Sequence, residues 1–498
     1  MSDINKKMAK GAAWMVLFKF VERGIGLAST VVLARLLTPA DFGLVAMAMS
    51  LIAMLELLGA FSFDWSLIQR EEAKSDHFNT AWTFTVLFAM SCAAVLVASS
   101  GFAADFYQEP RLREVMCVLA VGTLIQGFEN IGVVSFRREL QFNREFKFLL
   151  AKKLAAVAVT IPLAFATRSY WALVAGVVFG KAVSVTFSYV IHSYRPKFSL
   201  AAFGDLFHFS KWLLINNVIS FLNNRSADFV IGKLAGAPAL GLYSIAYEIS
   251  NLPTTELVAP INRAAFPGYS RLANDLVKLR ESFMGVIGMI AMMAMPAAAG
   301  IAMVADLLVP VMLGDKWLAV VPVIQVLAFY GAIMSLQSNI VYVYVAIGKP
   351  RLVTLIGGIQ VVILLVSLFS LIPKYGVMGA AWAFLLTAIV LIPVNQWVVA
   401  AKLELSVRAY LLGFWRPMMA TLAMVIVVMA LRDQISSPLE FEQQVGALLL
   451  LSLVGAGVYV SLLLGLWRLS SCPDGPERFC VTRFKEFLCK VRLLGRVS

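Results

Sequence analysis

Runs of about 20 apolar residues recur along almost the whole chain. A helix of roughly 20 residues crosses the hydrocarbon core of a bilayer, which is about 30 Å thick. Because no water reaches that region, the backbone there must satisfy its hydrogen bonds within helices. Hydrophobic residues make up 60% and charged residues 14% of 498 positions, too little charge to cover a soluble protein of this size. The sequence therefore predicts an all-α polytopic membrane protein.

About fourteen such segments are present, and each is a predicted transmembrane helix. Eighteen basic residues lie in the connections on the side of the N-terminus, and six lie in the opposite connections. Basic loops stay in the cytoplasm during insertion. We therefore expect a multi-pass protein of the bacterial inner membrane with both termini in the cytoplasm. The predicted segments are 11–37, 42–64, 80–102, 114–134, 149–167, 170–192, 209–235, 240–266, 283–306, 318–346, 352–372, 376–400, 410–431 and 444–467.

The beginning of the chain resembles its middle when the sequence is shifted by 198 residues. Trp14 then aligns with Trp212 and Gly43 with Gly241, and both copies contain a tight turn between two long spans on the outer side. Six spans separate the copies, so both have the same orientation, which implies a pseudo-twofold axis along the membrane normal. The prediction is two parallel six-helix lobes, 1–198 and 199–405, then two extra helices within 406–467 and a basic cytoplasmic tail, 468–498.

Ionisable side chains within the predicted spans need a partner or a wet cavity, because exposure to hydrocarbon is costly. Lys19 and Arg23 share one helical face, which corresponds in the repeat to the face of Asn217, Asn224 and Asp228. Cations combined with amides suit an anionic ligand that carries hydroxyl groups. The predicted substrate-binding residues of the cavity are Lys19, Arg23, Lys181, Asn217, Asn224 and Arg225.

Carboxylates at membrane depth can carry protons, which makes them candidates for ion coupling. The alternative is that acids and bases only neutralise one another, as the spacing of Lys19 and Glu22 or of Arg225 and Asp228 allows. For Glu256 an interfacial capping role is an equal alternative. The coupling candidates are Glu22, Glu56, Asp228, Glu248 and Glu256.

Sequence signals of an enzyme are missing. The chain has no phosphate-binding loop of the ATPase type, no nucleophile elbow and no HExxH helix. Its three histidines are far apart and its five cysteines have no metal-ligand spacing, so we expect neither a metal site nor a cofactor. Prolines at 253 and 260 interrupt the eighth span and would let it bend.

The net charge of +13 does not indicate nucleic-acid binding, because the basic residues are spread over alternate loops and the tail. The tail combines basic residues with a run of apolar ones from Phe479 to Val491. This pattern favours a short helix on the anionic lipids of the inner leaflet, with a disordered tail as the alternative.

Several motifs resemble the polysaccharide transporter (Wzx-type) branch, and specifically its colanic-acid exporter subgroup, of the multidrug/oligosaccharidyl-lipid/polysaccharide exporter superfamily. They are Lys10-Gly-Ala-Ala-Trp14, the first outer turn at 34–44, the stretch 138–143 after the fourth span, and the segments 260–267 and 309–317. The likeness covers roughly residues 5–430. It implies a V-shaped pair of six-helix lobes that alternates access to a central cavity.

The resemblance also implies the substrate, an undecaprenyl-pyrophosphate-linked oligosaccharide carried from the inner to the outer leaflet. Proton or sodium antiport would drive it, and cavity cations would hold the pyrophosphate, for which Lys19, Arg23, Lys181 and Arg225 match in type and depth. Membrane lipids, a polymerase and a chain-length regulator of the same pathway are the expected partners.

Two other functions are alternatives to the transport of a lipid-linked oligosaccharide. A multidrug or cation antiporter of the same superfamily would favour a mainly acidic cavity, whereas this one combines cations with amides. A polysaccharide polymerase or glycosyltransferase is disfavoured, because polymerases need a large outer loop and the longest outer connection here is 432–443.

Overall fold

The computed structural model is all-helical, with no strand among the residues that it describes. Those residues are 3–58, 67, 74–139, 141–406, 408, 410, 413–435, 439–473, 475–479, 481–483 and 486. Side chains at 3–13, 15–17, 58 and 203–216 lie outside the description, which includes that of Trp212 in the predicted repeat.

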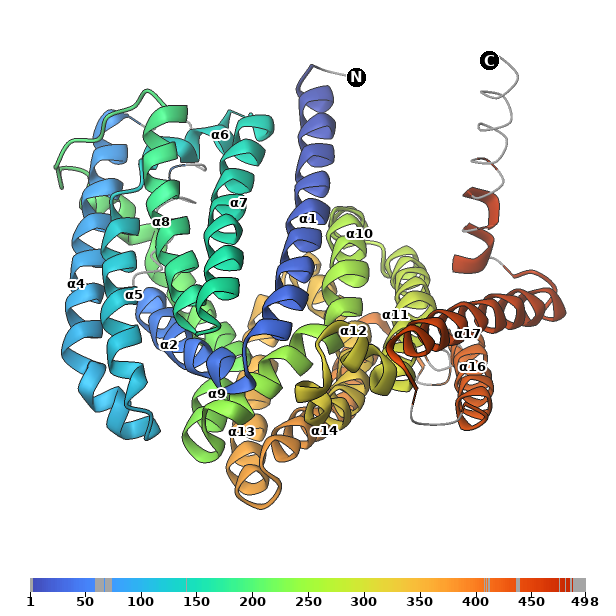
Figure 1. Ribbon diagram of the computed structural model, residues 1–498. Helices are drawn as coiled ribbons and strands as arrows, with labels where there is room; N and C mark the ends of the chain where they lie inside the picture. The colour runs from blue at the N-terminus through green and yellow to red at the C-terminus, as the bar shows by residue number, and fades with distance from the viewer. Residues whose placement is uncertain are drawn as a thin grey trace, which may run out of the picture. The chain divides into compact units, whose positions relative to one another are not determined.

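Long helices account for almost all of the fold (Figure 1). The N-terminal half contains α1 (Asp3–Leu36), α2 (Pro39–Leu58), α4 (Ser75–Tyr107), α5 (Arg111–Gly127), the short η1 (Ile131–Val134) and α6 (Ser135–Arg138), α7 (Phe142–Thr167), α8 (Trp171–Ile191) and α9 (Phe203–Ser250). The C-terminal half contains η2 (Pro253–Val258), α10 (Ala259–Leu272), α11 (Leu276–Met312), η3 (Asp315–Val320), α12 (Val321–Ala346), α13 (Pro350–Tyr375), α14 (Val377–Leu403), α16 (Trp415–Asp433) and α17 (Phe441–Leu469).

The described residues of each predicted span lie mostly on helix, and the polytopic class is confirmed. Residues 59–64 and 411–412 of the second and thirteenth predicted spans lie outside the description. Among the described residues, 11 helices are long and apolar enough to cross a membrane, or 12 if the bent pair of α5 with η1 and α6 is one span. That pair bends by 69°, which the sequence did not predict for the fourth span. The seventh and eighth predicted spans fall in one helical stretch, Asn217–Leu272. The count of fourteen stays a prediction.

The chain divides into two compact units, Met1–Ser244 and Ile245–Ser498. The division falls within α9, so the first unit holds the predicted N-lobe together with the seventh predicted span. The lobe boundary at residue 198 follows from the repeat and stays a prediction, as do the boundaries of the two extra helices and the tail.

In the first unit, α5 packs between α4 and α8, α7 packs on α8, and α1 packs on α7 (Figure 1). Gly176 permits the close contact of α7 and α8, because a Cβ atom there would lie only 1.7 Å from the Thr160 Oγ1 atom. The Thr160 hydroxyl bonds to the carbonyl of Ala156 in its own helix, so it is fixed in that position. Small residues of this kind are what lets membrane helices approach closely.

An extended segment between α8 and α9 links the N-terminal part of α4 to the bend after α5 and to α6. The Tyr194 hydroxyl donates to the Asn79 side chain at 2.8 Å, and the Asn130 amide donates to the Tyr194 carbonyl at 2.7 Å. His192 accepts a bond from the Tyr194 amide at Nδ1, and its Nε2 lies 3.0 Å from the Ser135 hydroxyl. A neutral imidazole satisfies both contacts, since Nδ1 must be free of a proton.

In the second unit, α11 packs on α12, α16 and α17, while α14 packs on α12 and α13. A buried polar chain links α10 to α12. The Tyr269 hydroxyl donates to Asn339 at 2.9 Å, Asn339 donates to Asn262 at 2.6 Å, and Asn262 donates to Ser338 at 2.8 Å. Directly before α10, the segment Pro253–Val258 is a π-helix, so the predicted interruption of the eighth span at Pro253 is present.

The contact at Gly176 predicts a destabilising substitution. Gly176→Ala should lower the free energy of unfolding of the purified protein by about 1–3 kcal/mol, the usual cost of overpacking, even though alanine favours helix. Thr160→Ala should restore part of the loss. Gly300→Ala is the matched control, since nothing lies within 4 Å of a Cβ at that helical position. Equal stability of the Gly176 and Gly300 variants would contradict the contact.

The environment of His192 predicts a pH dependence. Burial lowers the pKa of His192 below its ordinary value of 6.5. The unfolded chain therefore binds this proton more readily than the folded chain, and stability should fall as the pH decreases through about 6.5. Melting curves between pH 8 and pH 5 should drop less steeply for His192→Leu than for the parent. Parallel curves would show that His192 contributes no such term.

Candidate functional site

The middle of α1 carries three charged side chains of the predicted site. The Lys19 ammonium lies 2.8 Å from the Glu22 carboxylate, one helical turn away, so these two charges neutralise each other. Both are partly or fully exposed, whereas Arg23 is partly buried. Of the alternatives left open by the sequence, static pairing therefore describes Lys19 and Glu22 in this structure.

A second cluster joins α2, α5 and α8 within the first unit. The Lys181 ammonium, whose side chain is 13% exposed, lies 3.9 Å from the Glu56 carboxylate. It also donates to the Thr123 hydroxyl at 3.4 Å. Glu56 itself is 54% exposed. The sequence identified Lys181 and Glu56 separately, and the fold brings them together across two helices.

Glu129, at the bend after α5, extends this cluster and was not identified from the sequence. It accepts a bond from the Ser184 hydroxyl at 2.7 Å and one from the Gln126 amide at 3.0 Å. Ser184 lies one helical turn after Lys181 on α8. Glu129 sits near the inner end of its predicted span, where a carboxylate is ordinary, so no signal in the sequence marked it.

Two lysines of α7, Lys152 and Lys153, were also missed. Both are partly buried, and they lie about 20 Å along the helix from its C-terminal end at Thr167, at 1.5 Å per residue. The Lys153 ammonium reaches α1, because it lies 3.8 Å from where a Cβ of Gly26 would be. Lys152 is close enough to Lys181 for their like charges to repel. Their position within an apolar span was the signal that could have found them.

The first part of α9 carries the predicted amides and one ion pair. The Arg225 guanidinium lies 3.1 Å from the Asp228 carboxylate. The Arg225 side chain is 52% exposed and that of Asp228 is 9% exposed. Asn224 is exposed and donates to the Ser220 carbonyl at 2.8 Å, while Asn217 is partly buried. The Asp228 carboxylate is thus buried beside the Arg225 guanidinium.

The remaining coupling candidates lie in the second unit. Glu248 is near the end of α9 and Glu256 lies on the π-helix, and both are partly buried. A π-helix turn is rare and is often found at functional sites in membrane and soluble helices. This unusual backbone is an observation in favour of a functional rather than a capping role for Glu256.

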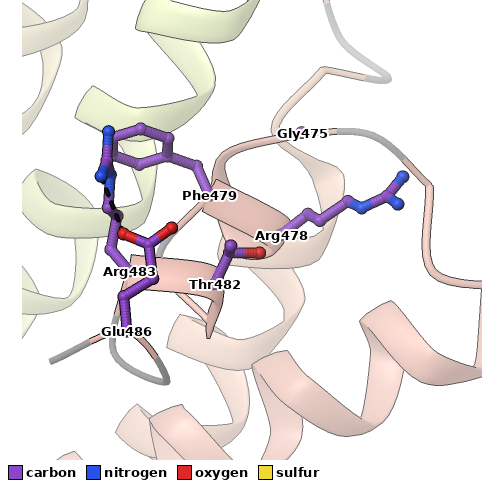
Figure 2. A pocket seen from close by; sticks show the side chains of 6 residues that line it. All are labelled: Gly475, Arg478, Phe479, Thr482, Arg483 and Glu486. Carbon is purple, nitrogen blue, oxygen red and sulfur yellow. Dashed lines mark hydrogen bonds and ion pairs between the residues drawn. The ribbon is translucent and has the colours of Figure 1, made fainter. Parts of the chain in front are cut away.

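Two hollows in the described surface contain none of the predicted site residues. One, of about 380 Å³, lies on the tail and is lined by Gly475, Arg478, Phe479, Thr482, Arg483 and Glu486. Figure 2 shows Arg483 beside the Phe479 ring, while Arg478 extends away from both. The Arg483 guanidinium lies 2.8 Å from the Glu486 carboxylate, which cancels much of its charge.

The tail is helical over 476–479 and 481–483, which agrees with the predicted short helix. It is held to α16 by a buried ion pair of Arg416 and Glu477, at 3.3 Å. The other apolar residues of the predicted tail helix, from Phe484 to Val491, lie outside the described residues.

The second hollow, of about 270 Å³, is an apolar pocket between α2, α4 and Phe229 of α9. In the part of the chain that is described, no three histidine, cysteine or acidic residues are grouped as metal ligands would be.

The chain is similar to known proteins over most of its length. The chain is 26% identical over 439 residues to the lipopolysaccharide biosynthesis protein WzxC of Escherichia coli (strain K12), which covers 86% of this chain and 88% of WzxC. It is 21% identical over 467 residues to the succinoglycan biosynthesis transport protein ExoT of Rhizobium meliloti (strain 1021), covering 92% and 93%.

The fold is that of the lipid II flippase MurJ. The inward closed conformation of MurJ superposes with a TM-score of 0.75 at 14% identity, over 91% of this chain and 98% of MurJ. An inward-facing multidrug transporter of the MATE family superposes with a TM-score of 0.61 over 77% of this chain. The family described as polysaccharide biosynthesis protein matches residues 32–322, which is more than half of the chain. The resemblance drawn from the motifs is thereby confirmed: this multi-pass membrane protein belongs to the polysaccharide biosynthesis protein family.

Proposed function

We propose that this protein is a flippase, not an enzyme, that moves an undecaprenyl-pyrophosphate-linked oligosaccharide across the bacterial inner membrane by alternating access. The observation that carries the proposal is the excess of cations over carboxylates on α1, α7 and α8 at membrane depth. The names of WzxC and ExoT add that related chains serve polysaccharide biosynthesis and its transport.

The charges that carry this argument are those of Lys152 and Lys153. Lys19 and Lys181 each have a carboxylate within 4 Å. For the two α7 lysines no such partner exists among the described residues. Uncompensated cations in hydrocarbon are costly unless a ligand supplies the negative charge. A pyrophosphate bears that charge, and Lys153 with Arg23 of the neighbouring helix would hold it.

Multidrug or cation antiport is the other candidate within this fold. An organic cation needs an acidic site, and the carboxylates Glu22, Glu56 and Asp228 all lie beside basic residues. The arrangement therefore favours the anionic substrate. A polymerase role finds no support in the described connections, which are short.

Ion coupling belongs to the same proposal. Asp228 is the leading candidate, because its carboxylate is buried beside the Arg225 guanidinium. The Tyr107 ring packs nearby, against Gly232 of the same helix. Protonation of Asp228 would release Arg225, whose side chain is half exposed and so free to meet an anion. Glu22, Glu56, Glu248 and Glu256 are the further coupling candidates.

The charge bias of the loops supports cytoplasmic termini in the inner membrane. In that orientation the tail helix would lie at the inner leaflet, in contact with anionic membrane lipids. A polymerase on the outer side and a chain-length regulator would be the partners that receive the flipped unit. The sugar itself is left open, since no linear motif encodes the cavity wall.

Substitution of the anion-holding residues tests the substrate. Lys153→Ala and Arg23→Ala should each slow transfer of a fluorescent undecaprenyl-pyrophosphate-linked oligosaccharide in reconstituted vesicles by about tenfold or more, since a lost charge-assisted bond is worth roughly 1.5–3 kcal/mol. Arg225→Ala should reduce transfer less than Lys153→Ala does, because the Arg225 guanidinium is already paired with Asp228. Lys153→Arg should keep most of the activity.

Lys374→Ala is the control for Lys153, since Lys374 is exposed at the outer end of α13. Undiminished transfer by both the Lys153 and Arg23 variants would remove the pyrophosphate site. Transport of organic cations by the parent, with no transfer of the lipid-linked sugar, would favour the antiporter instead.

Asp228→Asn tests coupling. We expect transfer by this variant to respond less than the parent to an imposed proton or sodium gradient, because an amide carries no ionisable proton. Glu248→Gln should be measured in parallel. Asp275→Asn, on an exposed inner turn, should behave as the parent. If both membrane variants keep the full response to both gradients, these two residues do not couple.

A further inference from the structure

The two outer turns of the internal repeat meet each other through glycine. A Cβ atom at Gly43 would lie 1.7 Å from the Ala237 carbonyl oxygen and 2.9 Å from the Gly241 nitrogen. A Cβ atom at Gly241 would lie 1.8 Å from the Pro39 carbonyl oxygen and 3.0 Å from the Gly43 nitrogen. Each distance is far below van der Waals contact with backbone, so only glycine fits at both positions.

The contact is reciprocal in the register of the repeat. With the offset of 198 residues, Gly43 corresponds to Gly241 and Pro39 corresponds to Ala237. The Ala237 carbonyl beside Gly43 and the Pro39 carbonyl beside Gly241 are therefore equivalent positions of the repeat. A pair of contacts related in this way is what a local twofold axis between the turns produces. The first turn joins α1 to α2, and the second is the break in α9 at Gly236, where φ is +80°.

The surroundings make this a dry, close-fitting contact. Leu37, Leu44 and Leu240 are fully buried, and Ala237 is 2% exposed. Directly before the second turn, Lys233 donates to the carbonyl of Phe106 at the C-terminal end of α4. A cation there also interacts favourably with the helix dipole. The second turn is thus held on two sides, by the first turn and by α4.

We propose that Gly43 and Gly241 are positioning residues of the transport cycle, and that their backbone contact is the seal on the outer side of the protein. This rests on the proposed function, in which the outer ends must part to release the lipid-linked substrate. Contacts of backbone with backbone in a packed interface are either formed or lost, since close-packed surfaces do not stretch. A side chain at either glycine would hold the turns apart and favour the state open to the outside.

The test uses a single cysteine at Ala237 in the full-length protein, with the five native cysteines replaced by serine. In intact spheroplasts this cysteine should react slowly with a membrane-impermeant maleimide, because the position is buried while the turns touch. Adding Gly43→Ala or Gly241→Ala should raise the labelling rate by tenfold or more. Gly101→Ala, in α4 with nothing within 4 Å of its Cβ, should leave the rate unchanged.

Unchanged labelling in both glycine variants, with normal amounts of protein in the membrane, would overturn the proposal. Should both variants fail to reach the membrane, Lys233→Gln replaces them, because it removes the bond to Phe106 without adding bulk. It should also raise the labelling rate, and an unchanged rate there overturns the seal.

Labelling requires no substrate, so it separates this inference from the proposed function. Faster labelling in a protein that fails to flip lipid-linked sugar would keep the seal and reject the substrate. Slow labelling in all variants of an active flippase would do the reverse.

Discussion

The cost of placing charge in hydrocarbon governs the arrangement of the polar residues in this protein. An ionised group at membrane depth costs a few kcal/mol or more unless a partner or water compensates it. Three of the cations predicted from the sequence have met that requirement inside the protein, through Glu22, Glu56 and Asp228. The partners come from the same helix for two of them and from a different helix for Lys181.

The α7 lysines differ from those three cations, and they make the net charge of the candidate site positive. Lys152 and Lys153 bring positive charge next to α1 and α8 without a described carboxylate to match it. This excess of positive charge is the reason for proposing a pyrophosphate rather than an organic cation as the substrate. Asn217 and Thr123 add an amide and a hydroxyl to the candidate site, and such groups bond to sugars.

Close approach through glycine serves two different purposes in the first unit. At Gly176, two long helices lie together over much of their length, so the contact fixes the helix pair. At Gly43 and Gly241, two turns meet through their backbones. Glycine thus allows permanent helix packing at Gly176 and, in the proposed transport cycle, a contact that can separate at Gly43 and Gly241.

Much of the fold was predictable because hydrophobic length is a local property. The described residues of the predicted spans lie mostly on helix, and both predicted turns are present, since apolar runs and turn residues act within a few positions of one another. The bend of 69° after α5 was not predictable, because Asn130 adopts it through bonds to Ser188 and Tyr194, far along the chain. Glu129 was missed because a carboxylate near the end of a span is typical of an interfacial residue, whereas the position of the α7 lysines within an apolar span did mark them in the sequence.

The membrane class, the helices and the family could be predicted from the sequence, because hydropathy, periodicity and motifs are properties of the chain itself. The two-lobe repeat stays a prediction. The sequence also identified Lys19, Lys181 and Arg225 as unusual residues. The three-dimensional structure was needed to show that Glu56 is the partner of Lys181 and that Gly43 and Gly241 touch. Those outcomes depend on distances between helices that are remote in sequence, and Coulomb and steric forces act through space rather than along the chain.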